Sequence, residues 1–314
     1  MTEGAADVRI RSLRPSRGFV DPYRAHGSIL ESERRPDGRV EQAFTLFASG
    51  AECPFTCSFC DLWQWSIDGP TPPGALIQQV EHALHTLGGS QPDRFKFYNA
   101  SNFFDKRAVP PDDANRIAEL TRGFAGVTVE SHANTIGPTV MAFAERVGGR
   151  LEVAMGLETV HPVAMTHLNK RLDLSRFDAA ARLLSDHDID LRVFVLLGAP
   201  YVPAAESIEW TRRTVAHAVD CGAAVVSIIP VRGGNGELER LHALGHFTPP
   251  RLGDLEAALE ASAGFSSAVV TADLWDAERL PGCEACRAAR VERMRHVNIT
   301  GVLSESVMCD ACGG

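Results

Sequence analysis

The chain has 314 residues, of which 45% are hydrophobic and 23% charged, and its net charge at pH 7 is −9. This length suits one large α/β domain with an appendage, and the composition excludes a disordered or fibrous protein. The negative net charge argues against an extended nucleic-acid interface, because such interfaces are basic. No apolar run reaches membrane-spanning length, and residues 1–11 lack the apolar core of a secretory signal, so we expect a cytoplasmic protein.

Residues 1–42 are expected to form a basic arm and a hairpin ahead of the main domain. Seven arginines fall between residues 8 and 35, where prolines and glycines interrupt any helix, so we expect an irregular arm packed across the domain. This arm is either a solvated surface or a holder of an anionic substrate or partner. The alternation over residues 30–47 breaks at Pro36-Asp37-Gly38, a turn sequence that predicts a hairpin.

The predicted strand at 43–48 stops at Gly50 and leads into a loop with three cysteines, Cys53, Cys57 and Cys60. Cytoplasmic thiols are kept reduced, so cysteines there indicate metal or redox chemistry before disulfides. Zinc ribbons usually use two C-x2-C pairs, whereas three thiolates on a cubane iron–sulfur cluster leave one iron without a protein ligand. The C-x3-C-x2-C spacing therefore favours a cluster with an open iron, and a partial structural metal site is the alternative.

A regular alternation of helices and strands follows the cysteine loop. Helices are expected at 73–87, 111–124, 138–147, 175–186, 204–221, 237–244 and 252–263. Strands are expected at 94–98, 127–130, 151–157, 191–197 and 224–229, with a last short strand at 269–271. The strands are continuous apolar runs, as in buried parallel sheets, and no glycine-rich dinucleotide fingerprint accompanies them. We therefore predict an α/β fold over residues 43–265, a partial (β/α)6 barrel, with its site at the carboxyl ends of the strands.

The C-terminal extension, residues 266–314, carries a second set of cysteines, the pairs Cys283/Cys286 and Cys309/Cys312. Two C-x2-C pairs predict a four-ligand metal centre, and both zinc and an auxiliary [4Fe–4S] cluster take four thiolates. We expect this centre to fix the tail, with its basic helix at 287–296, over the carboxyl-end mouth of the barrel. Cys221, alone at a helix end, is expected to be a core cysteine.

Several motifs resemble those of a known superfamily. The spacing of the first three cysteines, with Phe59 before the last, resembles the radical S-adenosylmethionine (SAM) superfamily. Gly156-Leu-Glu-Thr, Leu168-Asn-Lys and Val195-Leu-Leu-Gly-Ala-Pro resemble its subfamily of the elongator acetyltransferase subunit and the methylthiotransferases. Within that subfamily, residues 43–260 are most similar to the radical SAM subunit of archaeosine synthase. This chain is shorter and acidic, so the resemblance carries over the mechanism and not the substrate.

The resemblance implies a reaction. Cys53, Cys57 and Cys60 would hold a [4Fe–4S] cluster whose open iron chelates SAM. One-electron reduction, from a donor such as ferredoxin or flavodoxin, would cleave SAM to methionine and a 5′-deoxyadenosyl radical. That radical would abstract hydrogen from a small molecule or a modified nucleoside. Two alternatives stay open: sulfur insertion with a sacrificial auxiliary cluster, and a non-catalytic iron–sulfur or zinc protein.

The resemblance also implies a SAM pocket at the strand ends. Adenine needs an apolar wall, the amino-acid part an acceptor and a cation, and the ribose polar side chains. The residues implied are Phe59 and Pro230 beside adenine, Asn99 and Ser101 at the methionine amine, Glu158 at the amino-acid or ribose part, and Lys170 and Arg192 at the carboxylate. The second strand ends in Asn-Ala-Ser-Asn where the family has Gly-Gly-Glu.

Overall fold

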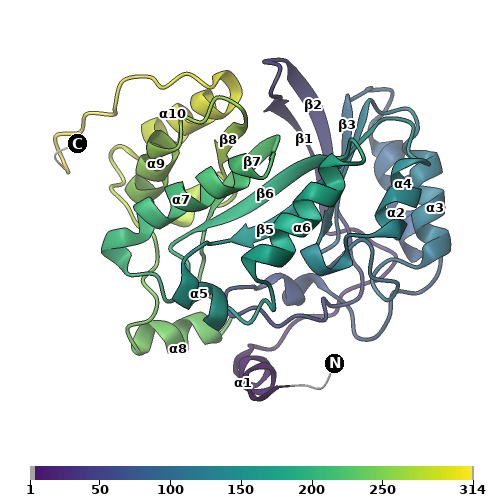
Figure 1. Ribbon diagram of the computed structural model, residues 1–314, viewed down its shortest axis with the longest axis horizontal. Coiled ribbons are helices and arrows are strands. Elements are labelled where there is room, and N and C mark those ends of the chain that lie inside the picture. The colour runs from purple at the N-terminus through teal and green to yellow at the C-terminus, as the bar shows by residue number, and fades with distance from the viewer. Residues whose placement is uncertain (1–3, 313–314) are drawn as a thin grey trace.

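The computed structural model of the chain describes residues 4–312 and contains one sheet of eight strands, ordered β1 to β8 as in the sequence. β1 pairs with β2 in antiparallel fashion, and every later pair of neighbours is parallel. Figure 1 shows the sheet curling into a partial barrel with helices on its outside. The strands are β1 (Gly27–Arg34), β2 (Val40–Phe47), β3 (Arg94–Tyr98), β4 (Gly126–Ser131), β5 (Arg150–Glu158), β6 (Asp190–Leu197), β7 (Val225–Pro230) and β8 (Val269–Ala272).

Helices connect the parallel strands and cover their outer faces. They are α2 (Ala75–Thr86), α3 (Pro111–Leu120), α4 (Pro138–Ala144), α5 (Pro162–His167), α6 (Leu174–Ser185), α7 (Ser207–Asp220), α8 (Glu237–Ala243) and α9 (Leu252–Ala261). Alternate strand residues such as Phe95 and Phe97 point outward and are fully buried in one core with Leu76 and Ile117 of the helices. Burial of these apolar stripes drives the layered packing. None of the described helices is long and apolar enough to cross a bilayer.

The predicted partial barrel is confirmed, with one parallel strand and one antiparallel strand beyond the six-stranded core. The hairpin predicted for residues 30–47 is the β1–β2 pair, and its turn contains Gly38 at φ +85°, a conformation that glycine adopts without strain. The last strand, expected at 269–271, is β8, which adds to the sheet beside β7.

The amino-terminal half of the barrel interior is filled by paired charges. Arg192 on β6 donates to Glu152 (2.8 Å) and to Glu33 (2.8 Å), and Arg35 donates to Glu152 (2.7 Å). Lys96 on β3 forms an ion pair with Glu33 as well. Carboxylates and guanidiniums that are buried together in this way satisfy one another.

This position differs from the one expected for Arg192. The residue aligns with Ala154 on β5, well before the strand reaches Glu158, so it lies toward the amino end of the barrel. Its side chain is only 5% exposed and is engaged by two carboxylates. Arg192 therefore belongs to the buried charge network and not to the residues gathered at the carboxyl ends of the strands.

The N-terminal arm begins with a helix, α1 (Ala5–Leu13), rather than with irregular chain. Residues 5–13 contain no proline or glycine, and the breakers that predicted an irregular arm begin only at Pro15. The helix does pack across the domain, at the carboxyl ends of the strands. Arg171 donates to Asp7 of α1 (2.5 Å), and Arg9 of α1 pairs with Glu237 of α8 (3.2 Å).

The C-terminal extension lies on the outside of the barrel, which corrects the expected lid over the mouth. Its helix α10 (Arg287–Thr300) packs against α9 and β8 (Figure 1) and also contacts β1, the strand at the other edge of the open sheet. Arg293 of α10 pairs with Glu256 of α9 (2.9 Å), and Asn298 holds the backbone of Ala272 in β8 through two hydrogen bonds of 2.9 and 2.8 Å. The helix α1, and not the tail, lies at the mouth, where Asp7 contacts Arg171 and Arg9 contacts Glu237.

Candidate active site

The three cysteines of the first motif lie on the loop that leaves β2. Burial raises the pKa of the Cys53 thiol to about 11 and that of the Cys57 thiol to about 12, and the pKa of Cys60 also rises. Buried thiols stay protonated until a metal replaces the proton. Among the described residues, these three sulfur atoms do not gather within 4.8 Å of one another, as ligands of a single ion would. The wider arrangement fits a cluster, in which each thiolate binds a different iron.

The cysteine loop is held in place by backbone contacts with two distant parts of the chain. Asn235, which follows β7 and is 1% exposed, donates its side-chain amide to the carbonyl of Ser58 (2.9 Å) and to that of Cys60 (3.3 Å). The amide of Ser58 in turn donates to the carbonyl of Leu168 (2.9 Å). Asn235 was not singled out from the sequence, since its glycine-rich surroundings indicate only a loop. It positions the loop, and so preorganises the three thiols.

Glu158 and Lys170 lie next to Phe59 of this loop, and their roles toward SAM stay predictions. Glu158 and Lys170 form an ion pair, and the Lys170 ammonium lies 6.0 Å from the centre of the Phe59 ring. Burial alone would lower the pKa of Lys170, but the Glu158 carboxylate and nearby thiols raise it. Glu158 adopts φ +68° after a register irregularity in β5. A side chain at Gly156 would place its Cβ 1.9 Å from Glu158 Oε1, so any larger residue there would displace the Glu158 carboxylate from its present position.

Asn99 and Ser101, at the end of β3, present polar atoms that have no partner within residues 4–312. Asn99 is 0% exposed, yet neither its Nδ2 nor its Oδ1 forms a hydrogen bond, and the enclosed Ser101 Oγ also lacks one. Buried polar groups are nearly always paired, so unpaired ones at a strand end indicate a place for a ligand. The next residue, Asn102, directs its amide to Cys53 Sγ (3.6 Å). These atoms fit a polar ligand beside the cysteine loop.

Glu130, at the end of β4, joins this group and was not among the predicted site residues. Its Oε1 accepts a hydrogen bond from the backbone N–H of Asn99 (2.7 Å). Burial raises the pKa of Glu130 to about 7, although the amides of residues 99–101 favour the ionised form. The only sequence signal was its place at a strand end. An acidic group that changes charge near neutral pH is typical of functional sites.

The raised pKa of Glu130 predicts a pH dependence of stability. The folded protein binds this proton more tightly than the unfolded chain does. The resulting stabilisation of the folded state is fully present below the ordinary carboxyl pKa and is lost as pH rises to about 7. We expect metal-free protein to lose up to about 3 kcal/mol of unfolding free energy from this group between pH 4.5 and 8. Urea unfolding across that range, compared with Glu130→Gln, measures the effect. Equal pH profiles for the two proteins would contradict the assignment.

The His132 side chain is a neutral ring that contacts the backbone of Lys170. Its Nδ1 accepts from the Asn134 amide (3.1 Å), so Nε2 carries the proton and donates to the Lys170 carbonyl (3.0 Å). Burial and the Lys170 charge lower the pKa of His132 to about 4. The ring stacks on Phe55 of the cysteine loop with 4.1 Å between ring centres. His132 thus links the loop to the Glu158–Lys170 pair.

The carboxyl half of the barrel interior is lined by half-buried, mostly apolar side chains. Strand residues that face inward there are partly accessible, whereas their outward-facing neighbours are buried. Phe47 and Tyr98 have ring centres 6.4 Å apart, and Tyr98 lies 6.2 Å from Phe194. Trp275, beyond β8, lies 5.4 Å from Phe47. These aromatic residues went unnoticed in the sequence because their inward direction depends on the register of each strand. Pro230 ends β7 and is buried.

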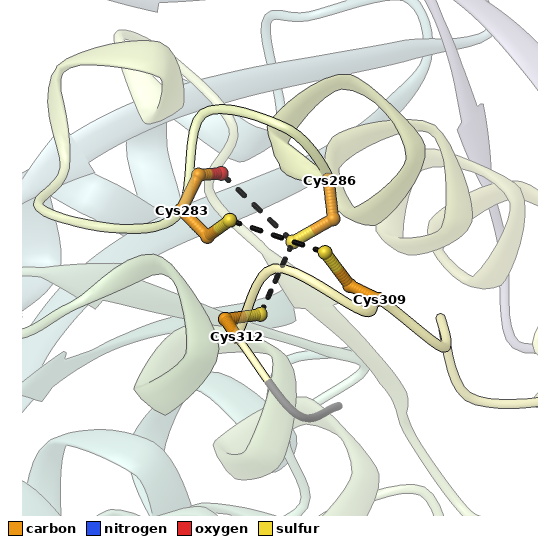
Figure 2. A group of neighbouring side chains, drawn as sticks. All are labelled: Cys283, Cys286, Cys309 and Cys312. Atoms are coloured by element: carbon orange, nitrogen blue, oxygen red, sulfur yellow. Dashed lines mark hydrogen bonds between the residues drawn. The ribbon is translucent and has the colours of Figure 1, made fainter.

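The C-terminal cysteines form a second, separate cluster. Figure 2 shows Cys283 and Cys286, from the loop before α10, pointing toward Cys309 and Cys312 of the tail. The four sulfur atoms all lie within 4.8 Å of one another, which confirms the predicted four-cysteine site. The Arg290 guanidinium donates to Cys286 Sγ (3.2 Å).

Cys221 is half-buried at the end of α7, not enclosed in the core as expected. Its thiol donates to Asp178 Oδ1 (3.4 Å), which also lies 2.7 Å from His217 Nε2. The thiol packs at the edge of the core and uses a polar partner from α6, which sequence position alone does not reveal.

Comparison with solved structures identifies the fold. A radical SAM methyltransferase from Sphaerobacter thermophilus matches with a TM-score of 0.52 and 16% identity, over 78% of this chain and 72% of that one. Streptococcus suis SuiB, solved with its precursor peptide SuiA, matches with a TM-score of 0.52 and 13% identity over 76% and 48%. Methylornithine synthase (PylB) matches with a TM-score of 0.50 and 15% identity over 71% and 62%.

The chain spans less than two thirds of the length of SuiB and of methylornithine synthase. No protein-family model matches the sequence, and no curated protein matches it either. The narrower resemblance to the archaeosine synthase subunit stays a prediction. At these identities the structural likeness establishes the fold. The chain has the partial-barrel fold of the radical SAM superfamily, as its cysteine spacing predicted.

Proposed function

We propose that this protein is a radical SAM enzyme, with a [4Fe–4S] cluster on Cys53, Cys57 and Cys60. The observation that carries the proposal is that three half-buried thiols and the unpaired buried polar atoms of Asn99 and Ser101 occur together at the mouth of a radical SAM barrel. A [4Fe–4S] cluster held there would pass one electron from an external donor to SAM, which would give methionine and a 5′-deoxyadenosyl radical. The radical then removes a hydrogen atom from a substrate.

The residues around the cysteine loop match the parts of SAM by their chemistry. Asn99, Ser101 and Glu130 offer acceptors and donors for the charged amino-acid part. The Glu158–Lys170 pair supplies one carboxylate and one ammonium, which can exchange their mutual contact for contacts with ligand charges. The Phe59 ring and the apolar end of β7 at Pro230 suit the adenine face.

The aromatic lining of the carboxyl half supports a small substrate with a planar or apolar face. Phe47, Tyr98 and Phe194 present ring surfaces that are partly open, and the charges below them are neutralised in ion pairs. Such a site selects by shape and stacking more than by charge. Both a small molecule and a nucleoside base meet this requirement. A one-electron donor such as ferredoxin or flavodoxin completes the proposed partners.

The experiment that tests the proposal is SAM turnover by the reduced protein. Anaerobically reconstituted protein, treated with dithionite and SAM, is expected to form 5′-deoxyadenosine and methionine in equal amounts. A Cys221→Ala variant serves as the control for removal of a cysteine outside both clusters. A protein that binds iron but leaves SAM intact would be an electron carrier or scaffold, and would overturn the enzymatic proposal.

A second test addresses the SAM contacts. Glu158→Gln should weaken SAM binding by about 1.5–3 kcal/mol, because a charge-assisted hydrogen bond loses its charge. Equilibrium binding of SAM to reconstituted protein measures the change, and the iron content should remain that of the wild type. Glu119→Gln, on exposed helix α3, is the matched control. Unchanged SAM affinity would assign Glu158 a purely structural role toward Lys170.

A further inference from the structure

We propose that the C-terminal cysteine site binds one tetrahedral zinc ion and not an auxiliary iron–sulfur cluster. The site consists of Cys283, Cys286, Cys309 and Cys312, whose spacing in the sequence is compatible with either group. The sulfur positions in the folded chain distinguish the two. This inference is independent of SAM cleavage at the first cysteine motif.

The first argument is the size of the sulfur cage. The Sγ atoms of Cys283 and Cys309 lie 4.0 Å apart, and those of Cys286 and Cys312 lie 3.8 Å apart. A tetrahedral zinc with Zn–S bonds of about 2.3 Å places its sulfurs about 3.8 Å from one another. A cubane carries each thiolate on a separate iron, so its outer sulfurs stand roughly 6 Å apart. The four thiols are therefore placed for a single ion and leave too little space for four irons.

The second argument is the contrast with the first motif of the same chain. The sulfur atoms of Cys53, Cys57 and Cys60 do not all lie within 4.8 Å of one another, whereas the four C-terminal sulfur atoms do. The structure thus holds one open set of three thiols and one closed set of four. A closed four-thiolate set is typical of structural zinc, which leaves no coordination position for a substrate.

The third argument concerns the arginines beside the site, which are occupied by the protein itself. Arg290 donates to Cys286 Sγ (3.2 Å) and pairs with Glu256, so it offsets the net negative charge of four thiolates on a divalent ion. Arg293 donates to the Ser304 carbonyl (2.7 Å) and pairs with Glu256. These contacts tie the tail to α9 and α10 and do not form a free anion site.

Zinc in this position would hold the C-terminal tail, which has no regular secondary structure over residues 301–309, against the rest of the protein. The tail is held at Arg293 and at the cysteines. Metal binding would contribute directly to the stability of this extension. The site would then neither relay electrons nor donate sulfur, which removes the support that a sacrificial auxiliary cluster would give to a sulfur-insertion reaction.

Metal analysis of three reconstituted proteins tests the inference. Wild type should hold about one zinc and about four irons per chain, taking four irons per cubane. Cys309→Ser/Cys312→Ser should lose the zinc and keep the irons, whereas Cys53→Ala/Cys57→Ala/Cys60→Ala should lose the irons and keep the zinc. About eight irons without zinc in the wild type, or iron loss in the tail variant, would overturn the proposal.

A second measurement does not depend on the folding of any variant. Wild-type protein that takes up Co²⁺ in place of zinc should show the intense visible absorption of a tetrahedral tetrathiolate site, and one equivalent of added zinc should abolish it. Proteolysis should cut residues 301–312 faster in the Cys309→Ser/Cys312→Ser protein than in Cys221→Ser, the matched cysteine control. Absence of the cobalt signal, or equal cleavage of both variants, would overturn the proposal.

Discussion

Simultaneous replacement of Cys53, Cys57 and Cys60 by alanine is expected to reduce 5′-deoxyadenosine formation to the level measured without protein. These thiols are the ligands that the loop offers, and burial keeps them protonated until a metal binds. The barrel itself should stay folded, because the loop is held through backbone carbonyls by Asn235 and by the Leu168 contact. Chromatographic detection of 5′-deoxyadenosine after reduction with dithionite measures the loss.

The controls separate loss of the cluster from loss of the fold. Circular dichroism and the zinc content of the triple variant should equal those of the wild type. Cys221→Ala should retain full SAM cleavage, since that thiol lies on the outer helical layer beside Asp178. Persistent 5′-deoxyadenosine in the triple variant would show that another part of the chain binds the reactive cluster.

Glu152→Gln should destabilise the fold by about 3 kcal/mol, because Arg35 and Arg192 lose the buried carboxylate that they share and each keeps its other partners, Asp190 for Arg35 and Glu33 for Arg192. The Glu152 side chain is 0% exposed and accepts from Arg35 (2.7 Å) and from Arg192 (2.8 Å). Burial would raise the pKa of Glu152, but Arg192 and Arg35 hold it well below the usual range, so the carboxylate is ionised in the folded protein. Denaturant unfolding of the metal-free variant measures the change in free energy.

Glu209→Gln is the matched control for this substitution. Glu209 also pairs with two arginines, Arg212 (2.9 Å) and Arg213 (2.8 Å), but its side chain is 45% exposed on α7. Solvent screens such a surface pair, so the variant should lose no more than about 1 kcal/mol. Similar losses for the two variants would mean that the interior network is as well solvated as the surface one.

The regular part of the fold was predictable because each element carries its own local pattern. The apolar run at 191–197 correctly predicted β6 (Asp190–Leu197), and the helical spacing of apolar residues at 73–87 correctly predicted α2 (Ala75–Thr86). Parallel strands buried on both faces need continuous apolar residues, and that requirement shows in the sequence. The strand predicted at 43–48 also placed the cysteine loop correctly, because the loop directly follows the carboxyl end of β2.

The parts that were mispredicted depend on contacts between residues far apart in the sequence. The resemblance implied that Arg192 contacts the SAM carboxylate, but its side chain is held by Glu33, which is 159 residues away in the sequence. The helix α1 was missed because the breakers after Pro15 were applied to the whole arm. The place of the tail depends on α9, through Glu256, and sequence spacing does not reveal which helix face receives it.

The hydrogen bonds of Asn235 imply an order of events during protein synthesis. Asn235 is 177 residues beyond Ser58, the residue whose carbonyl it holds in the cysteine loop. At about 5–20 residues per second, Cys53, Cys57 and Cys60 leave the ribosome roughly 10–35 seconds before the residue that fixes their loop. During that interval the thiols are not yet enclosed by the finished barrel. Iron–sulfur delivery to the nascent chain therefore meets a fully accessible loop, whereas delivery to the completed fold must reach thiols that are only partly exposed.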